Sequence, residues 1–432
     1  MTGKKCENVK EYESSWYSLT PNRLLATLGA PKGEINCDVC VVGAGFTGLS
    51  AALELAQKGY SVVVLEAETI GAGASGRNGG HLQRGYIHSP ATLAGKFDPA
   101  TAKHMCNWSL EALGLLIARI QKHDIKCDLK FGHLTAAEND KHKKHLKEEI
   151  DAWAKIGHND LQYLDEAETQ GLVKTKRYTG GLFDPKGGHF HPLNYALGLA
   201  RALQVAGGKI YEKSPVTEIR QGDPAKVFTA QGKITAKYVV LGGMVNARGV
   251  EGLSSKVITA TAHVIATEPL GPERAHNILT KDIAVIDANF IMNYFRLSED
   301  RRLIFGGNCN YSDRDYKGQD EWLRRRMVSL FPKLALVGLD HCWRGKLDIT
   351  LNRLPHMGRF SPNIFYAHGY SGHGVILSNM AGKLIADAVS GTAEKFDVFT
   401  KIKHHDFIGG SLLKRPLFML GMLWFRLRDL LP

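Results

Sequence analysis

A glycine-rich turn between two apolar stretches constrains the fold of this chain more than any other feature. Residues 37–43 read CDVCVVG, residues 47–59 read TGLSAALELAQKG, and residues 60–67 read YSVVVLEA. The first and third are apolar runs of strand length, and the second has helical periodicity and ends at a glycine. They predict a strand, a helix and a second strand. This βαβ unit indicates an α/β fold with a parallel sheet.

The glycines between the first strand and the helix have the spacing of a dinucleotide-binding loop. The first permits a tight turn, the second lets a pyrophosphate approach the backbone, and the third lets helix and strand pack closely. The phosphate meets N–H groups at the positive end of the helix. Glu66, with Ala67 after it, closes the second strand about twenty residues on, where a carboxylate accepts from ribose hydroxyls. The loop residues expected at the cofactor are Gly43, Gly45, Phe46, Thr47 and Gly48.

A second glycine patch, GAGASGRNGGH in residues 71–81, follows the ribose-binding strand. An NAD fold needs no such loop, whereas a longer cofactor continues over it toward its reactive end. Arg77 and Asn78 among the glycines favour backbone wrapped around a ligand over a mobile surface loop. The patch therefore favours FAD over NAD, and the residues expected to contact FAD here are Gly73, Ala74, Ser75, Arg77, Asn78, Gly79 and Gly80.

Composition and charge argue against several other classes of protein. With 44% apolar and 23% charged residues, the chain has the make-up of an ordinary soluble enzyme. Its net charge of +12 is scattered and not gathered into a basic helix or tail, so we expect no nucleic-acid partner. No apolar stretch follows the first basic residues, so no secretory signal is expected, and the seven unevenly spaced cysteines favour reduced thiols in the cytoplasm. Cys37 and Cys40 face opposite sides of a strand, so no metal site is expected.

The length of 432 residues predicts two joined domains. Apolar residues recur at helical spacing from about 99 to 158, and strand-like pieces fill 257–343. We therefore expect an α/β protein, α+β overall, with a Rossmann-like FAD-binding domain and a substrate domain built on a mixed or antiparallel sheet. The FAD-binding domain is expected in residues 1–98, 191–256 and 346–432, and the substrate domain in 99–190 and 257–345.

These motifs resemble those of the D-amino-acid-oxidase-like flavoproteins, a family that includes sarcosine oxidase and glycine oxidase. The matching segments are 41–67, GASGRNGG in 73–80, YVVLGG in 238–243 and NIFYAHGYSGHGV in 363–375. The resemblance implies that N–H groups of the last segment face the pyrimidine edge of the flavin and stabilise charge on it. An intact flavin-edge loop argues against a non-catalytic dinucleotide-binding protein. The further FAD contacts that the resemblance implies are Val216, Gly242, Gly372, His373, Gly374 and Val375.

The chemistry that the resemblance implies is transfer of a hydride from the carbon bearing an amine to the flavin, followed by hydrolysis of the imine. In the sarcosine oxidase branch an aromatic residue and then a Lys follow the SGHG turn, and the Lys pairs with an α-carboxylate. Val375 and Ile376 stand there instead. We therefore expect an aliphatic amine whose carboxylate lies far from the reacting carbon, as in gamma-glutamylputrescine. Arg77 or Arg84 could replace the Lys, which leaves an amino acid or N-methyl amino acid as the alternative substrate.

Aromatic side chains are the expected walls of the substrate pocket, because they hold an aliphatic chain and attract an ammonium group. Core packing is the alternative role for Phe295 and Trp343. No strong base is expected, since the flavin carries the difficult step. The expected pocket residues are Tyr294, Phe295, Trp343 and Ile376, and the candidates for catalysis are His81, Tyr370 and His373.

Three further expectations follow from positions where this chain differs from its family. Asp348 or a neighbour stands where sarcosine oxidase relatives attach the flavin through a Cys, so FAD is expected to bind non-covalently, with Cys309 or Cys342 as the alternative attachment. Some oxidases of the family have a Lys above the flavin, and apolar residues 303–305 stand at that place in this chain. Dioxygen is still the expected electron acceptor. The alternative is a dehydrogenase that uses another acceptor. Residues 412–431 favour a docked terminal helix over the membrane-surface contact of a membrane-associated flavin dehydrogenase.

Overall fold

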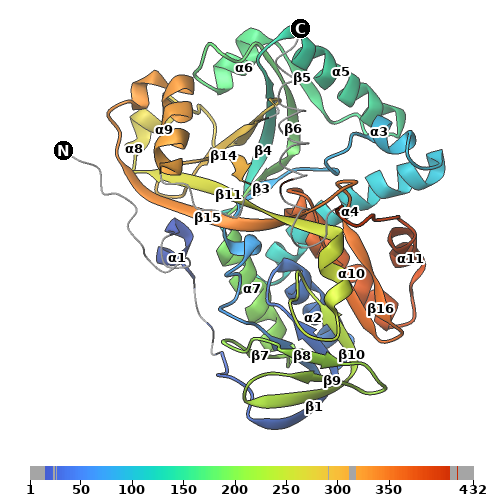
Figure 1. Ribbon diagram of the computed structural model, residues 1–432. Helices are drawn as coiled ribbons and strands as arrows, with labels where there is room; N and C mark the ends of the chain where they lie inside the picture. The colour runs from blue at the N-terminus through green and yellow to red at the C-terminus, as the bar shows by residue number, and fades with distance from the viewer. Residues whose placement is uncertain are drawn as a thin grey trace.

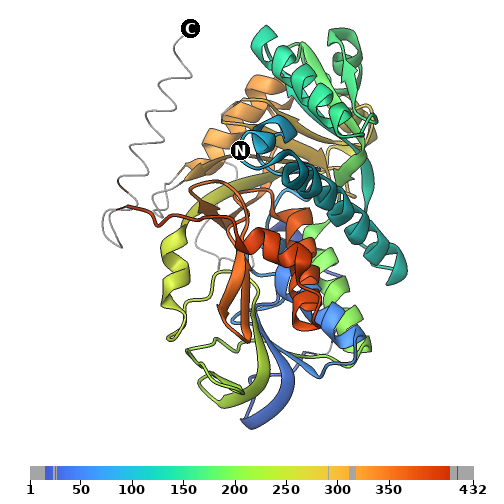
Figure 2. The same ribbon diagram turned by 90° about the vertical axis from the view of Figure 1, so that its right-hand side faces the viewer.

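The computed structural model describes residues 15–22, 25, 27–289, 291–310, 318–408 and 416. Two sheets lie one above the other (Figure 1), and the view from the side shows the same two-part arrangement (Figure 2).

The C-terminal segment 412–431, expected to be a docked helix, lies outside the described residues except for Pro416. Within the part of the chain described, no helix is long and apolar enough to cross a membrane.

The lower sheet contains the predicted βαβ unit. Its main path is parallel apart from the antiparallel pair β16 and β17, and β8 and β9 extend it from β10 as antiparallel strands. The order of the main path is β16 (His356–Ser361), β17 (Ile364–His368), β10 (Gly232–Leu241), β1 (Gly33–Val42), β2 (Val62–Leu65) and β7 (Lys209–Tyr211). The two additional strands are β8 (Glu218–Arg220) and β9 (Ala225–Phe228).

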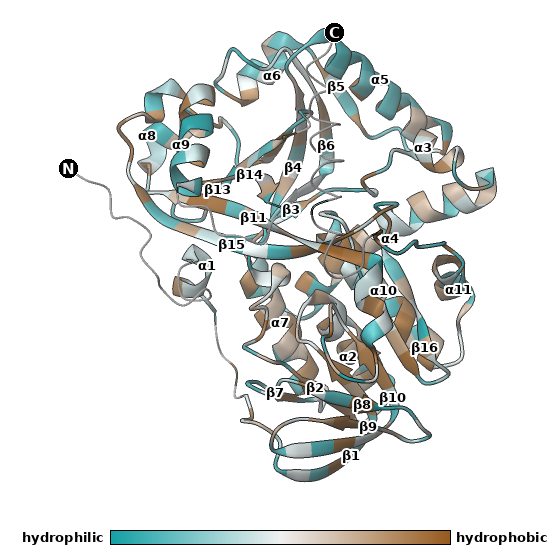
Figure 3. Ribbon diagram, in the orientation of Figure 1, coloured by the Kyte–Doolittle hydropathy of each residue, from teal (hydrophilic) through white to brown (hydrophobic). Residues whose placement is uncertain are grey.

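Helices α2, α7 and α10 pack together on the lower sheet. Nearly every residue of α2 is buried, as expected for a helix that is apolar on all sides and enclosed by neighbours. Helix α2 and parts of the strands beside it are hydrophobic, whereas α5 at the outer edge is mostly hydrophilic (Figure 3). The bounds are α2 (Phe46–Gln57), α4 (Pro99–Lys122), α5 (Asp140–Lys155), α7 (Pro192–Val205), α10 (Gly374–Val389), α11 (Glu394–Thr400) and α1 (Trp16–Leu19).

The upper sheet has nine strands and is mixed, because β12 and β4 are parallel while its other pairs are antiparallel. The order is β15 (Leu339–Thr350), β11 (Val257–Thr267), β14 (Leu303–Asn310), β13 (Asn293–Leu297), β12 (Ala284–Asp287), β4 (Lys130–Ala137), β6 (Gly180–His189) and β3 (His81–Leu82), with β5 (Gln162–Leu164) on β6. Helices around it are α3 (Pro90–Ala94), α6 (Glu166–Leu172), α8 (Gly271–His276) and α9 (Gln319–Leu330).

The predicted fold class, an α/β protein with a second mixed sheet, is confirmed. The stretch expected to be helix-rich holds α4 and α5, but also strand β4 between them. Strand β3 pairs in the upper sheet although its residues were expected in the FAD-binding domain. The division of the chain into domains stays a prediction.

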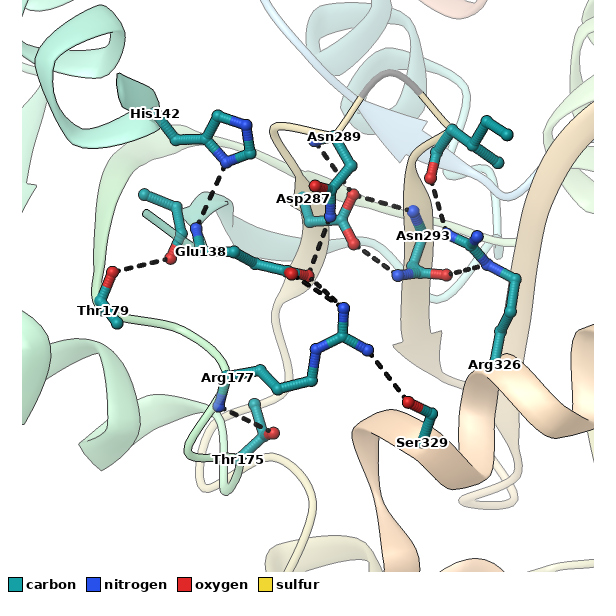
Figure 4. A network of polar contacts seen from close by, with 12 residues as sticks. Glu138, His142, Thr175, Arg177, Thr179, Asp287, Asn289, Asn293, Arg326 and Ser329 are labelled. Atoms are coloured by element: carbon teal, nitrogen blue, oxygen red, sulfur yellow. Dashed lines mark hydrogen bonds and ion pairs between the residues drawn. The ribbon is translucent and has the colours of Figure 1, made fainter. Parts of the chain in front are cut away.

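The two faces of the upper sheet have different roles, which strand β13 shows. Successive side chains on a strand point to opposite faces. Tyr294 packs against the core shared with the lower sheet, whereas Phe295 is buried in a separate core with α8 and α9. On the face that carries α9, Arg326 donates to Asn293 Oδ1 at 2.7 Å. Arg177 donates both to Glu138 and to Ser329 of α9 (Figure 4). This network fastens α9 to the face of the sheet that lies away from the glycine patches.

Candidate active site

The first glycine turn is too tight for side chains. Gly43 has φ +101°, a conformation that favours glycine, and its N–H donates to Leu65 O at 2.8 Å. A Cβ on Gly48 would lie 2.0 Å from Gly43 O, and one on Gly242 would lie 2.7 Å from Gly48 Cα. The start of α2 is therefore pressed against the ends of β1 and β10, which leaves the first-turn amides of the helix as a site for an anion.

The second glycine patch folds onto the first. Ser75 Oγ accepts from Phe46 N at 2.9 Å, and Gly71 N donates to Ala44 O at 3.1 Å. A Cβ on Gly45, the residue before α2, would lie 2.9 Å from Ser75 Oγ. The two patches are adjacent in space and thus form one cradle around the start of α2.

The carboxylate of Glu66 stands at the end of β2, beside this cradle. Its Oε2 accepts from Ala44 N at 2.7 Å and its Oε1 from Glu68 N at 2.9 Å. Burial raises the pKa of Glu66, although both backbone hydrogen bonds oppose the shift. The backbone carbonyl of Glu66 accepts from Ser214 N at 2.8 Å, which brings the segment before Val216 to the same edge. Ala67 next to it is exposed.

Arg296, which was not predicted from the sequence, holds the second patch from strand β13 of the upper sheet. Arg296, 1% exposed, donates from Nε to Gly79 O at 2.8 Å and from Nη2 to Tyr17 OH at 3.0 Å. A Cβ on Gly80 would lie 2.1 Å from Phe190 O, so the patch is packed closely on this side. An Arg within the strand-like run NYFRL was the available signal, because a cation in a buried strand requires partners.

Side chains within the patch also fix its shape. Asn78 donates from Nδ2 to Ala74 O at 3.0 Å and to Ser75 O at 2.8 Å, and its Oδ1 accepts from Gly80 N at 2.8 Å. Trp343 Nε1 donates to the backbone carbonyl of Arg77 at 2.9 Å. The backbone of the patch is thereby held in place before any ligand binds, while a Cβ on Gly73 would meet no protein atom within 4 Å.

The flavin-edge loop expected from the sequence reaches the same place from the C-terminal part of the chain. Tyr370 OH and Thr47 Oγ1 lie 2.8 Å apart, which joins the loop to the first turn of α2. Gly372 has φ +96°, and its Cβ would meet only a Leu347 methyl at 3.9 Å. His373 precedes α10, and its Nδ1 is buried without a hydrogen-bond partner among the described residues. Burial lowers the pKa of His373 to about 4, so the ring is neutral.

A group of buried imidazoles lies next to the second patch. His81 meets Tyr294 and His133 edge-on, with ring centroids 5.6 Å and 5.5 Å away. His189 is the cross-strand partner of His81. Burial lowers the pKa of His81 well below its usual range, that of His133 to about 4, and that of His189. His81 was predicted from the sequence, whereas His133 and His189 were not; a His within each strand was the only signal.

The structure separates some residues that were expected to share one pocket. Phe295 is 0% exposed and stacks on Phe305, on the face of the sheet opposite Tyr294. Trp343 is 2% exposed and holds the second patch. Ile376, also 2% exposed, packs in the large core. Tyr294 and Tyr370 are partly buried and pack against that core.

Arg84 is already bound by acidic side chains. It donates from Nε to Asp184 Oδ2 at 2.6 Å and from Nη1 and Nη2 to Asp160 at 3.0 Å and 2.9 Å. Two carboxylates therefore occupy the guanidinium that the sequence left as a possible partner for a substrate carboxylate. Arg77 donates from Nε to the backbone carbonyl of Arg344.

These features fit a FAD molecule. Glycines at the start of α2 leave room for a pyrophosphate, Glu66 stands where a ribose is expected, and the positions beside Gly73 and Gly372 are open. The N-terminus of α10 provides a positive end near the flavin-edge loop. In the described ranges no group of three or more His, Cys, Asp or Glu side chains is arranged to hold a metal ion.

Comparison with known proteins agrees with this interpretation. Residues 38–388 match the family described as DAO, FAD dependent oxidoreductase. The chain belongs to this family. It is 40% identical to gamma-glutamylputrescine oxidoreductase of Escherichia coli K12, over 98% of this chain and 99% of the relative. It is 37% identical to the probable oxidoreductase OrdL of Haemophilus influenzae, over 91% and 92% of the two chains.

Solved structures show the same fold. Glycine oxidase from Geobacillus kaustophilus superposes with a TM-score of 0.71 at 24% identity, covering 86% of this chain and 99% of that one. The L-proline dehydrogenase from P. horikoshii gives a TM-score of 0.70 at 19% identity, covering 86% and 98%. The protein is thus a FAD-dependent oxidoreductase of the DAO family.

Proposed function

We propose that the protein oxidises the primary amine of gamma-glutamylputrescine with non-covalently bound FAD. The products are gamma-glutamyl-aminobutyraldehyde, ammonia and, with dioxygen as the electron acceptor, hydrogen peroxide. The observation that carries this proposal is the 40% identity to the E. coli gamma-glutamylputrescine oxidoreductase over nearly the whole of both chains. Two features of the site support the proposal. One is the cradle for FAD, and the other is the absence of a cation after the SGHG turn that could pair with an α-carboxylate.

Different residues of this chain are proposed to bind the pyrophosphate, the ribose and the flavin ring of FAD. The first-turn amides of α2, behind Gly43, Gly45 and Gly48, receive the pyrophosphate, and Glu66 receives the ribose hydroxyls. The loop from Tyr370 to Val375 borders the flavin ring with its backbone N–H groups. When bound, FAD supplies the hydride acceptor. The protein orients the amine and excludes competing reactions.

The surroundings of the reacting carbon suit an amine without a neighbouring carboxylate. His81 and Tyr294 present uncharged rings, and Val375 and Ile376 provide no cation after the SGHG turn. Arg84 is neutralised by its two carboxylates. A buried α-carboxylate would therefore lose its pairing and still bear the cost of desolvation, several kcal/mol by the usual measure.

The test is an anaerobic titration of the purified yellow protein with gamma-glutamylputrescine, putrescine, sarcosine and glycine. We expect the flavin absorption band to bleach fastest with gamma-glutamylputrescine and slowly with the two amino acids. A clear preference for sarcosine or glycine would refute the proposal and favour an amino-acid oxidase. In air, hydrogen peroxide formed in step with aldehyde supports dioxygen as the acceptor. Turnover only with an artificial acceptor would make the protein a dehydrogenase.

A further inference from the structure

Three buried ring nitrogens in the upper sheet have no hydrogen-bond partner among the described residues. They are Nε2 of His81, Nε2 of His133 and Nδ1 of His189, from the neighbouring strands β3, β4 and β6. Leaving a buried polar group without a hydrogen-bond partner destabilises the folded protein. Three such groups in one cluster indicate that something polar lies between them. A buried water commonly satisfies groups of this kind.

One end of the cluster lies at the proposed amine site. His81 is the last residue of the second glycine patch, and its ring meets Tyr294 edge-on. His133 stands behind His81, with 5.5 Å between the ring centroids, and His189 pairs with His81 across the strands. The three imidazoles are therefore neighbours.

The other end reaches the surface. His189 Nε2 lies 2.9 Å from Asp282 Oδ1; the His189 side chain is 0% exposed, whereas that of Asp282 is 35% exposed. Asp282 lines a surface cavity together with Asp128 and Lys130. The cluster thus connects the inside of the protein to solvent through one carboxylate.

We propose that His81, His133 and His189, joined by a buried water and ending at Asp282, conduct a substrate proton from the amine site to solvent. This inference rests on the proposed amine oxidation. The substrate R–CH2–NH3+ gives one proton to the relay and becomes R–CH2–NH2, which can then lose a hydride from its carbon. One proton enters at His81 and one leaves from Asp282, and no electron passes through the relay.

Neutral imidazoles suit this task, because each carries one N–H donor and one acceptor nitrogen. The charged and titratable groups facing them are Arg296 toward His81 and His189, Asp184 and His373 toward His133, and Asp128 and Asp282 toward His189. Burial holds the pKa of all three imidazoles below the usual range, so a proton is not trapped on any of them.

The kinetic test replaces the carboxylate at the surface. Asp282→Asn keeps the size of the side chain and removes the proton acceptor. We expect anaerobic flavin reduction by the best amine to slow by about tenfold or more, the solvent deuterium isotope effect to rise, and added formate to restore the rate. Asp128→Asn is the matched control, because it removes the same charge from the same cavity. A wild-type rate and isotope effect in Asp282→Asn would overturn the proposal.

A second measurement does not depend on activity. A high-resolution crystal structure should show an ordered water within about 3.2 Å of the three unpartnered nitrogens. If the three nitrogens had no water or other polar partner in such a structure, the relay would be overturned. If no amine bleaches the wild-type flavin, the proposed function fails; if amines bleach it and Asp282→Asn behaves as wild type, only the relay fails.

Discussion

Gly48→Ala should reveal how closely the cofactor turn is packed. The new Cβ would lie 2.0 Å from Gly43 O and 3.1 Å from a Val41 methyl, so the start of α2 must move away from β1 by more than an ordinary adjustment. Because α2 is buried on nearly all sides, the shift disturbs its neighbours as well. Overpacking of this kind costs about 1–3 kcal/mol, and here it also displaces the amides expected at the pyrophosphate.

The assay compares thermal unfolding and the ratio of flavin to protein absorbance in purified variants. Gly114→Ala is the matched control, since this glycine lies in α4, is exposed, and a Cβ there would meet nothing within 4 Å. We expect the control to keep its FAD and to be as stable as wild type or slightly more so, because Ala favours helix. A Gly48→Ala protein with full FAD content and an unchanged melting temperature would refute the packing argument.

Three further outcomes are expected. Gly45→Leu should give apoprotein, because its Cβ already lies 2.9 Å from Ser75 Oγ and the rest of the side chain enters the expected phosphate site; a full complement of FAD would contradict this. Acid precipitation should leave the yellow cofactor in the supernatant, whereas colour in the pellet would indicate a covalent bond. Hydrogen bonding to Arg84 holds the pKa of Asp160 well below its usual range, so the pair's stabilisation is present above about pH 4 and is lost as the pH falls. Asp160→Asn should therefore lower the melting temperature at neutral pH and approach wild type in acid; equal melting curves throughout would contradict this.

Local sequence predicted the cofactor half of the fold well. The expected helix at 47–59 is α2, Phe46–Gln57, and the strands on either side of it are β1 and β2. Strand β4 was missed because its partners, β6 and β12, are distant in sequence, and pairing with them decides its conformation. Short-range periodicity carries no information about such partners.

The parts of the candidate site that could be predicted from the sequence are those where the backbone conformation requires glycine. Glycines at a tight turn are visible in a sequence, and the structure brings the two patches and the flavin-edge loop together around α2. Placing Tyr294 and Phe295 in one pocket overlooked the alternation of a strand, which turns them to opposite faces. Arg296 acts through Gly79 and Tyr17, contacts that depend on the tertiary fold.

The position of His133 depends on a bulge that no count of alternating residues reveals. Lys130 pairs with His189, and in a regular strand a residue three positions later would face the opposite side. The register shifts between Phe131 and His133, and Gly132 between them has φ +106°. This irregularity accompanies the contact between the His133 and His81 rings.

Gly132→Ala tests whether the bulge places His133 in the relay. Gly132 has a positive φ, and a Cβ there would lie 2.6 Å from an Ile283 methyl. Gly157 also has a positive φ, +99°, but a Cβ there would meet nothing within 4 Å. Gly157→Ala is therefore a control for backbone strain alone. Both variants should lose about 1–3 kcal/mol of stability. Only Gly132→Ala should also slow anaerobic flavin reduction and raise its solvent isotope effect, because it moves His133 away from His81. If both variants reduced their flavin at the wild-type rate, the bulge would have no part in proton transfer.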